Sequence, residues 1–210
     1  MKICFATPNT SHMRKLKLQI QVTVDGYVGG PDGDHDWRIW NWDEKLKAFA
    51  YPLRDVCDTI LIGRKTAEVF IPHFEETVNN VQGKNADKAQ DEKFKYASRM
   101  VSMPKIIFSK TIKTFDGKNV TVENGDLVTT IQNLKVNEGK DMIVYGGAGF
   151  VSSLIKEGLI DEFYFFVNPV MIGKGLRIFD LLEHRQTLSP VSATLYECGI
   201  SVLAFRLNKG

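Results

Sequence analysis

The stretch Met142-Ile-Val-Tyr-Gly-Gly-Ala-Gly-Phe-Val-Ser-Ser-Leu-Ile155 decides how the rest of the chain is interpreted. Its apolar, partly β-branched beginning predicts a buried strand. Three glycines in four positions follow, and apolar residues then return at helical spacing, so the order is strand, glycine turn, helix. Glycine lets an anion approach the backbone, and a helix N-terminus presents unpaired N–H groups. The turn from Gly146 to Phe150 is therefore a candidate phosphate cradle, with tight packing alone as the alternative.

The same turn departs from the common nucleotide-binding fingerprints. The dinucleotide pattern G-x-G-x-x-G needs glycine at position 152, after Gly147 and Gly149, and the residue there is Ser152. The turn also lies late in the chain instead of on the first strand, and no Gly-Lys-Ser/Thr follows it. These departures disfavour both a Rossmann-type dehydrogenase and a Walker-type phosphate loop.

A second strand-to-helix turn carries positive charge. An apolar strand that begins near Asp58 breaks at Gly63 into a helix start with Arg64, Lys65 and Thr66. Cations in the first turn oppose the helix dipole, which favours acidic residues there. Either a bound anion such as a phosphate compensates them, or both side chains point into solvent.

A third predicted strand, after Pro104, ends in Ser109 and Lys110. In an open α/β sheet, ligands bind at the carboxyl ends of the strands. Cations at two strand ends and a glycine cradle at a third suit a ligand with several phosphates, such as a dinucleotide. The extra cations, Arg64, Lys65 and Lys110, favour NADP(H) over NAD(H), because a 2′-phosphate needs positive charge.

Length and composition are those of one globular domain. A chain of 210 residues with 43% hydrophobic and 25% charged residues can bury a substantial core. The formal charge of +2 gives no electrostatic reason to expect a nucleic-acid or membrane partner. The scattered cysteines Cys4, Cys57 and Cys198 argue against a disulfide framework and favour the reducing cytoplasm. We expect residues 1–13 to be a disordered leader or expression remnant, and residues 14–210 to form a single domain.

A long loop rich in tryptophan follows the first strand. Leu16–Val24 alternates apolar and polar residues, which predicts a strand with one apolar face. The next segment, Tyr27–Trp42, is a loop that contains Trp37, Trp40 and Trp42. Loops of this length inside compact domains are usually functional or disordered, and aromatic surface suits a flat ring ligand. The alternative is a lid that only covers the core.

The aspartates of this loop do not make a calcium site. Asp32, Asp34 and Asp36 imitate the start of an EF-hand loop, but Trp37 stands where the sharp glycine is needed. Position twelve of that loop would be Asp43 instead of Glu. The sequence therefore predicts no metal ion.

The remaining elements complete an α/β pattern. Asp43 is a plausible N-cap for a helix that reaches about Asp55. The polar, weakly periodic segment Glu75–Asp91 is expected to be a surface excursion. Thr187–Glu197 and Ile200–Leu207 flank Cys-Gly and predict an antiparallel hairpin.

Six motifs in order carry a resemblance to a known superfamily. They are Thr-Val-Asp-Gly-Tyr-Val-Gly-Gly-Pro-Asp-Gly (23–33), Ile-Gly-Arg-Lys-Thr (62–66), Phe-Ser-Lys-Thr (108–111), Tyr-Gly-Gly-Ala-Gly-Phe (145–150), Leu-Ile-Asp-Glu-Phe (159–163) and Pro-Val-Met-Ile-Gly-Lys-Gly (169–175). Together they resemble the dihydrofolate reductase superfamily over about residues 14–207. The most similar branch is typified by the reductase domain of the bifunctional riboflavin-biosynthesis deaminase-reductase.

The resemblance implies a three-layer α/β/α fold with a central mixed sheet, often dimeric, that binds NADPH. It assigns the adenosine phosphates to Gly63, Arg64, Lys65, Thr66, Ser109 and Lys110. It assigns the pyrophosphate to Gly146, Gly147, Ala148, Gly149 and Phe150. It also implies that the strand with Gln21 and Thr23 runs beside the nicotinamide, so that Gln21 contacts the cofactor and Thr23, Trp37 and Trp40 the substrate.

The sequence departs from both branches where the substrate is concerned. Classical dihydrofolate reductases place a carboxylate on the first helix, at a position near Lys47, with Asp43 one turn earlier. The riboflavin branch usually has a lysine on the first strand, and that position is Gln19. Candidate proton donors are Asp25, Asp43 and a bound water. Asp25 ranks first because its Asp-Gly lies in the first motif, with a turn residue as the alternative, whereas the N-cap role is favoured for Asp43.

The sequence thus predicts an NADPH-dependent reductase that transfers a hydride to a pterin-like or pyrimidine-derived small molecule. The substrate itself does not follow from the residues. A non-catalytic NADP(H)-binding protein of the same fold is the alternative, and the expected partners are a small molecule and a second copy of the chain.

Overall fold

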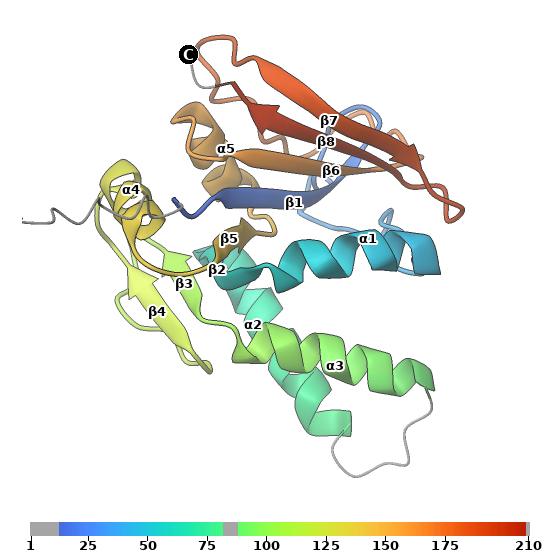
Figure 1. Ribbon diagram of the computed structural model, residues 1–210, viewed down its shortest axis with the longest axis horizontal. Helices are drawn as coiled ribbons and strands as arrows, with labels where there is room; N and C mark the ends of the chain where they lie inside the picture. Colours follow the sequence, from blue (N-terminus) through green and yellow to red (C-terminus); the bar gives the residue numbers. More distant parts are fainter. Residues whose placement is uncertain (1–12, 82–87, 209–210) are drawn as a thin grey trace, which may run out of the picture.

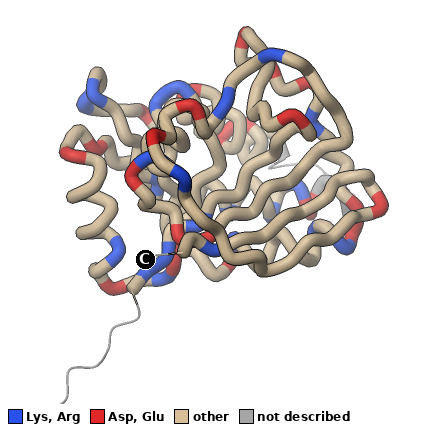
Figure 2. Tube along the Cα trace, turned by 90° about the horizontal axis from the view of Figure 1, so that it is seen from above, with Lys and Arg blue, Asp and Glu red and all other residues tan. Residues whose placement is uncertain are grey.

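The computed structural model describes residues 13–81 and 88–208, and Figure 1 shows their arrangement. Apart from Met13, the expected leader at residues 1–13 lies outside the described residues. Within the described part of the chain, no helix has the length and apolar character needed to cross a membrane. Figure 2 shows acidic and basic residues interspersed along the trace, in keeping with the formal charge of +2.

Residues 13–81 and 88–208 form an eight-stranded sheet in the order β4-β3-β2-β5-β1-β6-β8-β7. The strands are β1 (Leu16–Thr23), β2 (Cys57–Gly63), β3 (Lys105–Phe108), β4 (Val120–Glu123), β5 (Asp141–Val144), β6 (Glu162–Asn168), β7 (Leu188–Leu195) and β8 (Ser201–Leu207). The strands from β4 to β6 in this order pair in parallel, whereas β8 runs antiparallel to β6 and to β7. The predicted mixed sheet and C-terminal hairpin are confirmed.

In the described part of the chain, five helices cover the two faces of the sheet (Figure 1). They are α1 (Glu44–Asp55), α2 (Arg64–Val81), α3 (Lys88–Ser102), α4 (Leu127–Val136) and α5 (Ala148–Lys156). The apolar residues of α4 and α5 join one core cluster with β1, β5 and β6. The apolar residues of α2 and α3 pack on the other face, over β2 and β3, and α1 packs there over β6 and β8. The three-layer α/β/α fold is therefore confirmed.

The central position of β1 changes the meaning of its alternating pattern. Leu16, Leu18, Ile20 and Val22 form the expected apolar face. The opposite face is not open to solvent, because Lys17, Gln21 and Thr23 are also buried. Buried polar groups need hydrogen-bond partners, so this face of β1 requires either a hydrogen-bond network or a ligand.

The expected surface excursion at Glu75–Asp91 is largely wrong. Helix α2 continues to Val81 and α3 begins at Lys88, with residues 82–87 outside the described part of the chain. Phe70, Ile71 and Phe74 hold α2 in the core cluster on that face. The helix continues because this apolar stripe packs against α3 and the sheet, although the local sequence is polar.

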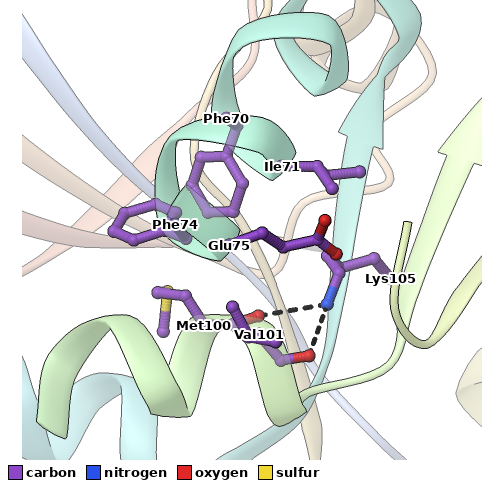
Figure 3. Close-up of a pocket in the computed structure, with 7 residues that line it drawn as sticks. All are labelled: Phe70, Ile71, Phe74, Glu75, Met100, Val101 and Lys105. Atoms are coloured by element: carbon purple, nitrogen blue, oxygen red, sulfur yellow. Dashed lines mark hydrogen bonds between the residues drawn. The ribbon is translucent and has the colours of Figure 1, made fainter. Parts of the chain in front are cut away.

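Buried Lys105 closes the end of α3. Its Nζ donates to the carbonyl oxygens of Met100, Val101 and Met103 at 3.1, 2.9 and 2.8 Å. Figure 3 shows this ammonium in a small pocket between α2 and α3, near the Glu75 carboxylate. Burial lowers the pKa of Lys105 to about 8. The three carbonyls are the orphan acceptors of a helix C-terminus, so this lysine serves the fold.

Candidate functional site

The three turns singled out in the sequence lie at one edge of the sheet. In the parallel register, Gly63 of β2 pairs with Phe108 of β3, and Leu61 of β2 pairs with Val144 of β5. The residues that follow these strands therefore leave the sheet side by side at its carboxyl edge. This is the edge at which open α/β sheets bind ligands.

Close packing joins the turn after β2 to the turn after β5. A methyl group built on Gly63 would lie 2.9 Å from Cβ of Phe150, so only glycine fits there without a shift. The Phe150 ring stacks on Phe108 with centroids 4.9 Å apart and an interplanar angle of 23°. Phe150 thus reaches from the first turn of α5 to β2 and β3.

The glycine turn leaves room where an anion would sit. Gly147 is the N-cap of α5, with φ +89°, and has no side chain to cap the helix. The first hydrogen bond of the helix runs from Val151 N–H to Gly147 O, 2.9 Å, so the N–H groups of residues 148–150 precede that ladder. A methyl group on Gly146 or Gly149 would meet no atom within 4 Å. Open space in front of free helical N–H groups fits the phosphates of a dinucleotide.

The predicted cations lie at the same edge, two of them with protein partners. Arg64 forms an i,i+4 ion pair with Glu68. Lys110 donates to the carbonyl oxygens of Asn124 and Gly125 at 3.1 and 2.6 Å. The exposed side chain of Lys65 forms no hydrogen bond or ion pair with any other described residue. A 2′-phosphate at this edge could pair with Lys65 directly. Arg64 and Lys110 would have to give up their present partners to bind it.

Ser109 and Thr66 contact the backbone of the turns in which the strands end. Ser109 Oγ accepts hydrogen bonds from the backbone N–H groups of Thr111 and Ile112 at 3.1 and 3.2 Å. Thr66 Oγ1 would lie 2.8 Å from a methyl group on Gly147, which places the threonine directly beneath the glycine turn. The Ser109 hydroxyl therefore holds its turn in position, and Thr66 packs against the glycine turn.

Gln21 belongs to a buried amide network. Asn168, at the end of β6, donates from Nδ2 to Gln21 Oε1 and to Phe166 O, both at 3.1 Å. Its Oδ1 accepts from the Ile39 N–H at 2.8 Å. Asn168 is fully buried, so it ties the polar face of β1 to the tryptophan loop. Sequence reasoning missed this residue, although an asparagine at the carboxyl end of a buried strand was a usable signal.

Asp25 joins two loops. Its carboxylate accepts hydrogen bonds from Thr23 Oγ1 at 2.6 Å, from the Ile172 N–H at 3.1 Å and from the Gly173 N–H at 2.8 Å. The hydrogen bond from Thr23, with those from the two backbone N–H groups, lowers the pKa of Asp25. A carboxylate held ionised in this way is a poor proton donor at neutral pH. The geometry fits the turn-residue alternative.

Asp43 also has both carboxylate oxygens engaged by the backbone. Oδ1 accepts from the Leu46 N–H at 2.9 Å and Oδ2 from the Cys198 N–H at 3.0 Å. These two backbone hydrogen bonds lower the pKa of Asp43. The residue caps α1 and attaches the β7–β8 hairpin to it, which fits the N-cap alternative.

The three tryptophans have three different surroundings. Trp42 stacks on Phe166 with centroids 5.3 Å apart and donates from Nε1 to Ile39 O, so it belongs to the core under α1. Trp40 is 67% exposed. Trp37 is half-buried, and its Nε1 is sealed from solvent with no acceptor in the described part of the chain. Trp40 and Trp37 remain the candidates for contact with a substrate.

Fold and site together define an α/β protein in which three turns meet at the carboxyl edge of a mixed sheet. The model of the RibD C-terminal domain matches residues 14–202, and the chain belongs to this family. The family assignment agrees with the six motifs that resemble the riboflavin-biosynthesis reductase branch.

The chain is also similar to several individual proteins. The chain is 28% identical over 200 residues to the "Uncharacterized protein YyaP" of Bacillus subtilis (strain 168), covering 95% of this chain and 98% of that protein. It is 24% identical over 195 residues to the riboflavin biosynthesis protein RibD of Corynebacterium ammoniagenes, covering 93% of this chain and 52% of that protein. The chain therefore spans about half of that RibD.

Among solved structures, a putative riboflavin biosynthesis protein from Shewanella sp. PV-4 has a TM-score of 0.65 at 20% identity, covering 94% of this chain and 100% of that chain. The diaminohydroxyphosphoribosylaminopyrimidine deaminase/5-amino-6-(5-phosphoribosylamino)uracil reductase of Thermotoga maritima has a TM-score of 0.62 at 18% identity, covering 93% of this chain and 57% of that chain. At these identities the two structures support the fold alone.

Proposed function

We propose that this protein is an NADPH-dependent reductase of a pterin-like or pyrimidine-derived small molecule. The main observation that supports this proposal is that three turns meet at one edge of the sheet, where Gly63 contacts Phe150 and Gly147 faces Thr66. Membership in the RibD C-terminal domain family supports a reductase, and the similarity to the Thermotoga maritima deaminase/uracil reductase supports a pyrimidine substrate.

The residues present fit the cofactor. The open space at Gly146 and Gly149 lies before the N-terminus of α5, where the helix dipole and N–H groups favour a pyrophosphate. Lys65, Arg64 and Lys110 would hold a 2′-phosphate. When bound, NADPH supplies the hydride.

The residues of the chain position the nicotinamide and the substrate and exclude water from them. In this proposal Gln21, fixed by Asn168, and Thr23, fixed by Asp25, line the nicotinamide and substrate positions. Fixed groups of this kind hold reactants in a productive geometry. Trp37 and Trp40 would cover the substrate from the loop and exclude water.

Proton delivery falls to a water molecule in this proposal. The carboxylates of Asp25 and Asp43 are the two candidates on the chain, and both are ionised and engaged by backbone N–H groups. The same observation favours the second candidate function, an NADP(H)-binding protein without turnover, because neither carboxylate has a proton to give.

Two measurements separate these functions. Titration with NADPH and NADH tests the cofactor, and equal or tighter binding of NADH would contradict the 2′-phosphate assignment. Absorbance at the NADPH band, followed with dihydrofolate and with a panel of pterins and aminopyrimidines, tests turnover. NADPH binding with no oxidation across the panel would favour the binding protein.

The proposal includes a homodimer in the cytoplasm. Apolar side chains on and near the β7 edge of the sheet support a second copy as partner, since Val191 and Leu195 are 50% and 73% exposed. Light scattering on the eluted protein gives the molar mass in solution, and a mass of one chain would contradict the dimer.

A further inference from the structure

Asn124, in the loop between β4 and α4, holds a turn that follows the neighbouring strand. Its Nδ2 donates hydrogen bonds to the carbonyl oxygens of Ser109 and Ile112, both at 2.7 Å. These carbonyls lie at the two ends of the four-residue turn after β3, so one amide group joins both ends of the turn. Asparagine suits this role, because its NH2 group carries two donors, whereas a serine hydroxyl carries one and an ionised aspartate none.

Ser109 depends on the shape of this turn. Its Oγ accepts hydrogen bonds from the N–H groups of Thr111 and Ile112 at 3.1 and 3.2 Å. The hydroxyl hydrogen can still be donated, either to Thr111 Oγ1 at 3.3 Å or to an oxygen of a ligand. The backbone that Asn124 holds therefore decides where the Ser109 hydroxyl points.

Lys110, in the middle of the turn, contacts the same loop. Its Nζ donates to the carbonyl oxygens of Asn124 and Gly125 at 3.1 and 2.6 Å. Asn124 thus contacts the turn with its side-chain amide and with its own backbone carbonyl. Phe108 pairs with Glu123 in the parallel register of β3 and β4, so the two loops leave the sheet side by side at its carboxyl edge.

The loop that carries Asn124 is fixed before and after this residue. The Gly125 N–H donates to the Glu123 carboxylate at 2.6 Å. The Asp126 carboxylate accepts from the Thr129 N–H at 2.9 Å, where it caps α4. A residue held on both sides can fix the position of the turn that it contacts.

We propose that Asn124 is a positioning residue that sets the preference for NADP(H) over NAD(H). The inference rests on the proposed function and deepens it, because it names the residue that keeps Ser109 and Lys110 where a 2′-phosphate meets them. The two cofactors differ only in that phosphate. A disturbed turn therefore weakens the binding of NADP(H) and leaves that of NAD(H) nearly unchanged.

Calorimetric titration of the full chain with NADP+ and with NAD+ tests this role. Asn124→Ala removes the amide without adding charge, so it should bind NADP+ about tenfold more weakly while its affinity for NAD+ changes less than about twofold. The ratio of the two affinities decides, because a general loss of structure would weaken both. Asn133→Ala removes an exposed amide from α4 and should leave the ratio unchanged, which makes it the matched control.

A double variant tests whether Asn124 acts through the turn. Lys110→Met should itself bind NADP+ more weakly, and adding Asn124→Ala to it should cost less affinity than Asn124→Ala costs in the wild type, because both residues serve one contact. If circular dichroism shows Asn124→Ala unfolded, Asn124→Ser decides in its place. Serine keeps one donor on a shorter side chain and should bind NADP+ several-fold more weakly.

The inference alone is overturned if the wild type prefers NADP+ and Asn124→Ala, or its substitute Asn124→Ser, keeps that preference. It is also overturned if the losses from Asn124→Ala and Lys110→Met simply add. A wild-type protein that binds NAD+ equally or more tightly contradicts the 2′-phosphate assignment, and one that binds neither cofactor contradicts the proposed reductase. Both of these results appear in the wild type, and the inference falls with them because no preference is left to set.

Discussion

The α-carbon of Gly147 faces the Thr66 hydroxyl so closely that a methyl group on the glycine would lie 2.8 Å from Thr66 Oγ1. This contact joins the first turn of α2 to the glycine turn before α5. Two strand ends that lie about 80 residues apart in the sequence thereby become one wall of the proposed cofactor cradle.

We predict that Gly147→Ala destabilises the protein by about 1–3 kcal/mol, because a side chain is strained at φ +89° and collides with Thr66. Urea unfolding at neutral pH measures the loss. In a Thr66→Gly background the collision is removed but the strained φ remains, so Gly147→Ala should cost less stability there than it does in the wild type. A Gly147→Ala protein as stable as the wild type would contradict this packing.

We predict the opposite effect on stability for Gly149→Ala. Its methyl group would meet no atom within 4 Å, and alanine favours helix, so the protein should gain up to about 1 kcal/mol. The same methyl group would stand in the space that we assign to the pyrophosphate, and NADP+ should bind about tenfold more weakly. Urea unfolding measures the change in stability, and calorimetric titration of the same preparation measures the affinity for NADP+. Unchanged NADP+ affinity would place the phosphates elsewhere.

The sequence predicted most elements because the local signals and the tertiary environment agree for them. The apolar runs of β1, β2 and β5, and the acidic N-cap Asp43, all lie where the patterns place them. The continuation of α2 to Val81 could not be predicted, since packing against α3 outweighs a polar local sequence.

The parts of the candidate site that are formed by glycine turns could be predicted from the sequence. The parts that depend on contacts between distant side chains were harder to predict. Gly63 and Gly147 stand out because only glycine fits their contacts. Asn168 did not stand out, because a hydrogen-bond partner 129 residues away leaves no periodic pattern in the sequence. Asp25 illustrates the remaining ambiguity, since the same residue type serves as acid and as turn anchor.

The pH dependence of stability tests the role of Asp25. Its folded pKa lies below the ordinary value of 3.8, so its contribution is fully present above about pH 4 and is lost as the pH falls through the folded pKa. Asp25→Asn should therefore be less stable than the wild type at pH 7, and the difference should shrink below pH 4. A difference that stays constant down to pH 3 would show that the charge does not matter. If Asp25 is no proton donor, the variant also keeps its turnover.

The amide network of Asn168 supports the last prediction. Asn168→Ala leaves the Ile39 N–H and Gln21 Oε1 without their buried partner, and we expect a loss of about 1–3 kcal/mol. The loop should loosen as well, so collisional quenching of tryptophan fluorescence by acrylamide should increase. Asn133→Ala, at an exposed position of α4, is the control. It should change the free energy of unfolding by no more than about 0.5 kcal/mol and leave the acrylamide quenching unchanged. Unchanged quenching in Asn168→Ala would mean that the loop is held by the stacking of Trp42 on Phe166 and not by the amide.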